Sequence, residues 1–209
     1  MGLDMHLYAI SRITAEEAEK YNGKPIGDIY NDGISVINVD NLDEEDVEMI
    51  RRIMPYLTKV TVVGSFLDVD KVRTENSIPD DAYISGESFS SEYTEYMFRN
   101  DRGFRKNVQI ENSKLYSDYA LHPTIEVYLF HKRGIHYWRK YYELQSYIYD
   151  MLENENGVYV MNCGYYPLTD GQIEEINGYL KDHPYGSGRI DEIPERNTED
   201  ETIVYWEWY

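Results

Sequence analysis

The sequence predicts an α+β fold in which three principal helices pack on a mainly antiparallel sheet of about five to six strands. Apolar residues recur with helical spacing in three segments, residues 42–57, 136–157 and 169–182. Short β-branched or alternating segments surround these helices, and the first and last of them are expected to share one sheet. The length of 209 residues suits a single domain, residues 1–209, with an irregular, insertion-like region at about 68–123.

The first third of the chain alternates short strands with acidic helices. Asn31-Asp32-Gly33 is typical of a hairpin turn, so the segments on either side of it are expected to be strands. Pro55 is expected to end the second helix near Met54, because proline cannot donate the helical hydrogen bond. The expected elements are, in order, a strand at 3–10, a helix at 14–21 capped by Thr14, strands at 26–30 and 34–39, the helix at 42–57 and a strand at 59–67.

A long amphipathic helix is expected to organise the second half of the chain, beginning at His136 after a strand at 125–130. Gly157 supplies its left-handed stop, and residues 158–160 restart as a strand. The buried face of this helix is expected to consist of Tyr137, Tyr141, Leu144, Ile148 and Met151. The remaining elements are a helix at 169–182 with a Thr169–Gln172 capping box and a final strand at 202–209.

The net charge of the chain limits the classes of partner that it is expected to bind. There are 39 acidic and 20 basic residues, which gives a net charge of −19. A chain of this charge repels nucleic acids and anionic membranes on average and attracts basic protein surfaces. The charge is uneven, because residues 14–50 carry a net charge of −9 while residues 99–140 carry +5. We therefore expect a basic protein surface as the partner, with no direct nucleic-acid or membrane contact.

The sequence favours a cytoplasmic protein. No window approaches the roughly 18 apolar residues that a membrane span requires. The first residues lack the basic and apolar regions of a signal peptide, and one cysteine cannot form an internal disulfide.

Several short motifs resemble a family of uncharacterised phage and prophage proteins. They are the opening Met1-Gly2-Leu3-Asp4-Met5-His6-Leu7-Tyr8, the run Tyr137-Trp138-Arg139-Lys140, the pairs Asn162-Cys163 and Leu168-Thr169, and the aromatic end Val204-Tyr205-Trp206-Glu207-Trp208-Tyr209. The resemblance covers both ends and the second half of the chain. It implies an origin in a mobile element, and hence the cytoplasm of a bacterial host, and it carries no activity.

Possible metal and thiol chemistry is outweighed by structural interpretations. Asp4 and His6 share one face of a strand and could join His136 or Cys163 around a metal, but no tight His/Cys cluster exists. A polar face of an edge strand is the favoured interpretation, so no metal or cofactor is expected. Cys163 could act as a nucleophile with a histidine, but its surroundings match no known signature, and a small core cysteine is favoured.

Nucleotide binding is a further interpretation of the sequence. Trp138-Arg139-Lys140 could stack on a base and neutralise a phosphate, although Trp138 is more simply a core residue. Residues 186–188, Gly-Ser-Gly, are too short for a phosphate-binding loop. The alternative function is accordingly a small enzyme or nucleotide-binding protein, with a site near Asp4, His6, Arg139 and Cys163.

The leading hypothesis rests on the acidic runs and the exposed tyrosines. Rows of carboxylates can imitate the phosphates of a nucleic acid, and tyrosine is favoured at protein interfaces. The sequence then predicts a non-enzymatic inhibitor of a host nucleic-acid-binding defence protein, of the anti-CRISPR or anti-restriction type. The expected binding residues are Asp43, Glu44, Glu45, Asp46, Glu48, Tyr142 and Tyr149.

Overall fold

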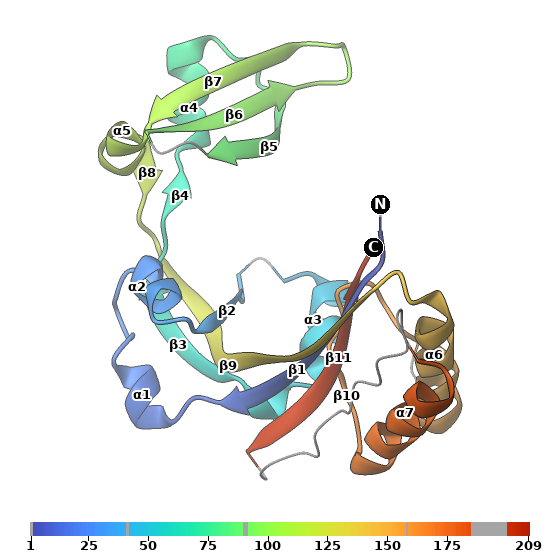
Figure 1. Cartoon of the computed structure of the whole chain (residues 1–209). Helices are drawn as coiled ribbons and strands as arrows, with labels where there is room; N and C mark the ends of the chain where they lie inside the picture. The colour runs from blue at the N-terminus through green and yellow to red at the C-terminus, as the bar shows by residue number, and fades with distance from the viewer. Residues whose placement is uncertain (1, 41, 90–91, 158, 185–199) are drawn as a thin grey trace. The chain divides into compact units, whose positions relative to one another are not determined.

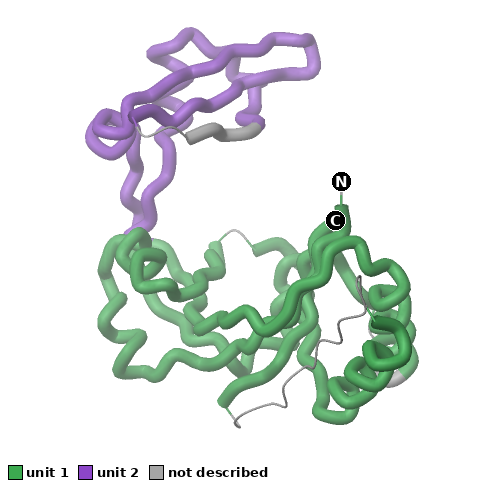
Figure 2. Tube along the Cα trace, viewed as in Figure 1, with its two compact units in different colours: residues 1–62, 125–209 green, residues 63–124 purple. Residues whose placement is uncertain are grey.

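The computed structural model describes residues 2–40, 42–89, 92–157, 159–184 and 200–209. The chain forms two compact units: unit 1 comprises Met1–Val62 and Ile125–Tyr209, and unit 2 comprises Val63–Thr124 (Figure 2). Unit 2 therefore occupies nearly the same range as the region at 68–123 that the sequence left unassigned.

Unit 1 is built on a six-stranded sheet whose order is β10-β11-β1-β9-β2, with β3 also paired to β9 (Figure 1). The pairings of β1 with β9 and β11, of β2 with β9, and of β10 with β11 are antiparallel. The predicted α+β fold and its mainly antiparallel sheet are confirmed, and the first and last strands are direct neighbours. The strands are β1 (Asp4–Arg12), β2 (Ser35–Asn38), β3 (Thr58–Val63), β9 (Thr124–Arg139), β10 (Tyr166–Pro167) and β11 (Glu201–Trp208).

The three predicted principal helices are present in unit 1, together with shorter ones. Thr14 caps α1 by accepting a hydrogen bond from the Glu17 N–H, and Thr169 and Gln172 form the predicted capping box of α7. The helices are α1 (Ala15–Glu19), α2 (Ile26–Asn31), α3 (Glu44–Arg51), the 3₁₀ turn η1 (Met54–Tyr56), α6 (Tyr142–Asn156) and α7 (Asp170–Asp182). The helix predicted at 42–57 is thus shorter than expected, and Pro55 lies in η1.

One face of the sheet packs against α6 and α7 and is called the α6/α7 face. Met5 and Leu7 of β1 and Trp138 of β9 are fully buried there with Leu144 and Ile148 of α6. Burying large apolar side chains of this kind contributes about 1.5–3 kcal/mol each.

The opposite face packs in part against α3 and is called the α3 face. Ile10, Phe130 and Val204 form its core with Ile50 and Ile53, which α3 and its continuation supply. Since successive strand residues point to opposite faces, the same three strands serve both cores.

Unit 2 contains more regular structure than the sequence indicated. Its three-stranded antiparallel sheet, β5-β6-β7, packs against α4, with Val72 of α4 buried beside Phe98 and Val108. The strand alternation of β6 is weak in the sequence, because the polar residues Thr94 and Tyr96 occupy buried positions of the strand. The elements are β4 (Phe66–Leu67), α4 (Val69–Asn76), β5 (Tyr83–Phe89), β6 (Tyr93–Arg99), β7 (Arg105–Glu111), α5 (Asn112–Ser117) and β8 (Ala120–Leu121).

The predicted hairpin around Asn31-Asp32-Gly33 is wrong, because residues 26–31 form helix α2. Gly33 has φ +74°, and its N–H donates to the Tyr30 carbonyl, while the Ile34 N–H donates to the Ile29 carbonyl. These two bonds define a Schellman motif, which uses the same left-handed glycine as a hairpin turn. The buried pair Ile29 and Ile34 completes it.

The predicted start of the longest helix at His136 is also wrong. Strand β9 continues to Arg139, and α6 begins at Tyr142. Lys140 has φ +57°, and its N–H donates to the Leu3 carbonyl, which marks the break between strand and helix. Tyr137 therefore lies on a strand and is 47% exposed, whereas the other predicted apolar positions of the helix are buried.

Two smaller strand predictions also fail. The strand expected at 59–67 is split, with β3 ending at Val63 and β4 beginning at Phe66. Gly157 is the left-handed C-cap of α6 as predicted, at φ +61°, but Tyr159 and Val160 are not in a strand, and Val158 lies outside the described residues.

Candidate functional site

The acidic first turn of α3 partly serves the helix itself. The Asp46 N–H donates to Asp43 Oδ1 at 2.8 Å, and the Asp43 N–H donates to Asp46 Oδ2 at 3.3 Å. This reciprocal capping box satisfies two helix donors, and the helix dipole favours both charges. Glu48 is paired with Arg51 at 3.0 Å and with Arg52 at 3.7 Å.

Glu44 and Glu45 remain as exposed charges in the first turn of α3, and Glu44 lines a hollow of about 510 Å³. Its lining is Leu42, Asp43, Glu44, Val47 and Arg51. Val47, an apolar residue of α3, is not buried in the core but 42% exposed. Lysine and arginine lay their apolar stems on such surfaces while the charged head meets a carboxylate. The hollow thus combines two carboxylates with the apolar side chains Leu42 and Val47 and one cation, Arg51.

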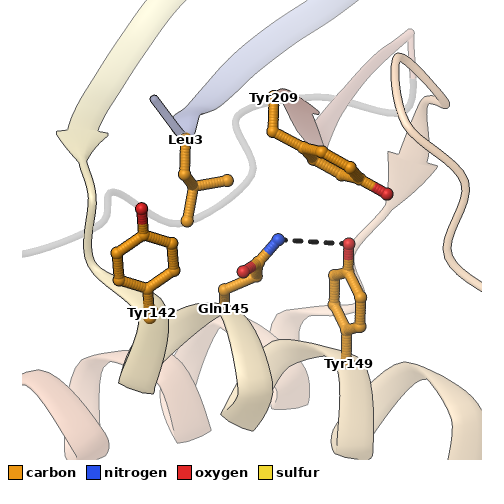
Figure 3. Close-up of a pocket in the computed structure, with 5 residues that line it drawn as sticks. All are labelled: Leu3, Tyr142, Gln145, Tyr149 and Tyr209. Atoms are coloured by element: carbon orange, nitrogen blue, oxygen red, sulfur yellow. Dashed lines mark hydrogen bonds between the residues drawn. The ribbon is translucent and has the colours of Figure 1, made fainter. Parts of the chain in front are cut away.

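Tyr142 and Tyr149 lie elsewhere, on α6. They line a second pocket of about 600 Å³ together with Leu3, Gln145 and Tyr209 (Figure 3). The Gln145 amide donates to the Tyr149 hydroxyl at 3.2 Å. The residues predicted as one acidic, tyrosine-rich surface are thus divided, because α3 packs on one face of the sheet and α6 on the other.

Glu207 lies fully buried next to this second pocket and was missed by sequence reasoning. Its carboxyl accepts hydrogen bonds from Gln145 Nε2 at 2.9 Å, from the Tyr205 hydroxyl at 2.5 Å and from the Tyr149 hydroxyl. No lysine, arginine or histidine of the described chain forms an ion pair with it. The sequence does contain a signal for the burial of Glu207, because strand alternation places it on the same face as Tyr205 and Ile203.

Burial raises the pKa of Tyr149 and of Tyr205, and the neighbouring Glu207 carboxyl raises both further. Both phenols are therefore neutral near pH 7 and act as hydrogen-bond donors. The hydrogen-bonded cluster of Gln145, Tyr149, Tyr205 and Glu207 connects α6 to β11, and two of its members, Gln145 and Tyr149, line the pocket.

The uncovered part of the α3 face gathers three residues of the alternative site. Arg139 Nε lies 3.6 Å from Asp4 Oδ1, and the Tyr137 hydroxyl donates to the same oxygen at 2.6 Å. Because β1 lies between β9 and β11, the expected edge-strand position of Asp4 and His6 is wrong. Burial lowers the pKa of His6, and Lys132 lowers it further against the opposing effect of Asp4.

Aromatic rings surround His6 on this face. Its ring centroid lies 4.8 Å from that of Tyr137, 5.2 Å from Tyr8 and 5.4 Å from Trp206. Lys132 Nζ lies 4.9 Å from the centroid of the Tyr8 ring. We call His6, Tyr8, Tyr137 and Trp206 the aromatic patch. Trp138, by contrast, is fully buried on the α6/α7 face, as its core interpretation predicted.

Cys163 contacts β11 through its backbone N–H, which donates to the Glu207 carbonyl at 2.9 Å. The side chain is half-buried, and burial together with Glu207 raises the pKa of the thiol. A raised pKa disfavours the thiolate that a nucleophile requires. Within the described ranges, no group of three or more His, Cys, Asp or Glu residues is placed to hold a metal ion. The Gly-Ser-Gly segment at 186–188 lies outside those ranges.

No known protein-family model matches this chain, and no curated protein matches its sequence. Function is accordingly argued from the sites themselves. None of the helices that the structure describes has the length and apolar composition needed to cross a bilayer.

Proposed function

We propose that this protein is a non-enzymatic, phage- or prophage-type interaction protein acting in the cytoplasm of a bacterial host. It binds the basic surface of a nucleic-acid-binding defence protein and blocks it, as an anti-CRISPR or anti-restriction inhibitor would. The observation that supports the proposal is the exposed pair Glu44 and Glu45 in the first turn of α3, where Glu44 lines the hollow. The motif resemblance to phage and prophage proteins supports the mobile-element origin.

Coulomb attraction is the physical basis of the proposal. A groove that holds duplex DNA faces about one negative charge per 1.7 Å of helix axis. A protein of net charge −19 is attracted to such a groove, and its exposed carboxylates increase the association rate. The apolar side chains Leu42 and Val47 add contact area for the stem of a bound lysine or arginine.

The test compares two double variants of equal charge. Glu44→Gln with Glu45→Gln removes two exposed charges from the first turn of α3, whereas Glu174→Gln with Glu175→Gln removes two exposed charges from α7. A partner is captured from host lysate, and its affinity for each variant is measured against salt and against competing DNA or RNA. We expect the α3 variant to weaken binding by about 0.2–1 kcal/mol per lost pair, with no loss for the α7 variant.

Salt and nucleic acid must both weaken the wild-type complex if the proposal holds. Equal losses in the two variants would show that only the net charge matters. Binding that ignores salt, nucleic acid and the α3 change would refute the proposal.

The aromatic patch favours nucleotide or single-strand binding as a second candidate. Stacking platforms combine several exposed rings with cations, and here Lys132 and Arg139 border the patch. Titration of tryptophan fluorescence with a short single-stranded oligonucleotide tests it. Quenching that disappears in Trp206→Leu and persists in Trp208→Leu would favour this candidate over the inhibitor.

A further inference from the structure

We propose that the pocket at α6 binds an organic ammonium cation of the quaternary or methylated type. The site is lined by Tyr142, Tyr149, Tyr209, Gln145 and Leu3 and lies above the buried Glu207. It is distinct from the hollow at α3 and does not depend on the function proposed above.

Three tyrosine rings meet around one pocket. Figure 3 shows the side chains of Tyr142, Tyr149 and Tyr209 arranged about the Gln145 amide, with Leu3 on the same side as Tyr209. Tyr142 and Tyr209 are each 53% exposed, so their rings are available to a ligand. Aromatic rings attract cations through their quadrupoles, and cages of such rings recognise quaternary ammonium groups.

A buried carboxyl group lies beneath the rings and favours a cation as the ligand. Glu207 is fully buried and, among the described residues, has hydrogen-bond donors but no cationic partner. Tyr149 connects the two parts of the site, because its ring lines the pocket while its hydroxyl donates to Glu207. A cation in the pocket therefore gains from the rings and from the carboxyl group behind them.

The lining also excludes other ligand classes. Among the described residues, the lining contains no lysine, arginine or histidine, so a phosphate or carboxylate would find no counter-charge there. The tyrosine hydroxyls and the Gln145 amide oxygen of the described lining can accept hydrogen bonds from a primary ammonium, but all of these acceptors are neutral. A quaternary ammonium has no N–H and binds through the rings without any acceptor. The volume of about 600 Å³ lies within the usual range for small-ligand sites.

The same chemistry can come from a free molecule or from a methylated lysine of a protein. The experiment uses the full chain with choline, with its neutral isostere 3,3-dimethyl-1-butanol, and with a trimethyllysine peptide beside its unmodified form. Isothermal titration or chemical shifts of the Tyr142 and Tyr209 rings report binding. We expect choline to bind about tenfold or more tightly than the neutral isostere, as a desolvated cation–π contact implies. A preference for the trimethyllysine peptide over choline would identify a protein as the source.

Matched variants locate the site. Tyr142→Leu is expected to reduce cation affinity about tenfold, while Tyr142→Phe retains the ring and the binding. Tyr30→Leu is the control, because Tyr30 is 58% exposed on α2, away from the pocket. Thermal melting verifies that each variant is folded.

Equal affinity for choline and its isostere would overturn the proposal. It would also be overturned if neither choline nor the trimethyllysine peptide bound. An equal loss in Tyr142→Leu and Tyr30→Leu would also overturn it. Failure of the α3 proposal would appear separately, as partner binding that is indifferent to Glu44→Gln with Glu45→Gln.

Discussion

The two faces of the central sheet use neighbouring residues in opposite ways. In β9, Trp138 is fully buried while Tyr137 is 47% exposed, and in β11 Glu207 is fully buried while Trp206 is only partly covered. An acidic side chain thus lies inside and aromatic rings lie outside, the reverse of what residue type alone would favour. The helix that covers each face determines which side chains are buried. On one face α6 supplies hydrogen-bond donors for Glu207, and on the other α3 leaves the aromatic patch partly exposed.

The two proposals rest on different faces of the sheet. The α6/α7 face encloses a polar cluster and borders the pocket proposed to bind a small cation. The α3 face presents charges and rings, and it is the face proposed to meet a macromolecule.

The largest effect is expected from truncating adjacent residues of β9. Trp138→Ala should lower the free energy of unfolding by about 3–5 kcal/mol, because it empties a fully buried position. Tyr137→Ala should cost about 1 kcal/mol or less, because its ring is half-exposed. Urea unfolding of both variants measures the difference. Similar losses would contradict the assignment of the two residues to opposite faces.

Alkaline pH should separate the phenols of the two faces. Burial raises the pKa of Tyr165, on the α3 face, to about 12, and the pKa values of Tyr149 and Tyr205 are also raised. A folded pKa above the unfolded value of about 10 stabilises the fold below pH 10, and this stability is lost as the pH rises through the folded pKa. Unfolding free energy should therefore fall from about pH 10 toward pH 12.

Absorbance at 295 nm checks this order of ionisation. Tyr165→Phe should remove one phenol that titrates near pH 12, while Tyr205→Phe should remove one that ionises only as the fold is lost. Stability that stays constant up to about pH 12 would show that these phenols are not buried as described.

The smallest effect is expected at Cys163, which lies in the loop before β10 and contacts β11 through its backbone. Cys163→Ala should cost about 1 kcal/mol or less, since the side chain is half-buried. A thiol reagent should label the native protein slowly at pH 7, because the raised pKa keeps the thiol protonated. Rapid labelling that abolishes binding would instead return the nucleophile interpretation.

Local chemistry explains why several elements were predictable. The capping box of Thr169 and Gln172, the left-handed Gly157 and the alternation of β1 depend on residues close in sequence. The errors have the same origin. Gly33 supplies a positive φ to a hairpin or to a Schellman motif alike, and the helix is the form in which Ile29 and Ile34 are buried together in the core.

The sequence by itself determined the α+β class, the main helices, the acidic first turn of α3 and the membership of both chain ends in one sheet. These follow from periodicity, capping and charge, which act over a few residues. Only the tertiary structure decided that Asp43 and Tyr142 lie on opposite faces, that Asp4 meets Arg139, and that Glu207 is buried beneath a tyrosine-lined pocket. Such contacts join residues far apart in sequence, and their formation depends on which helix covers which face.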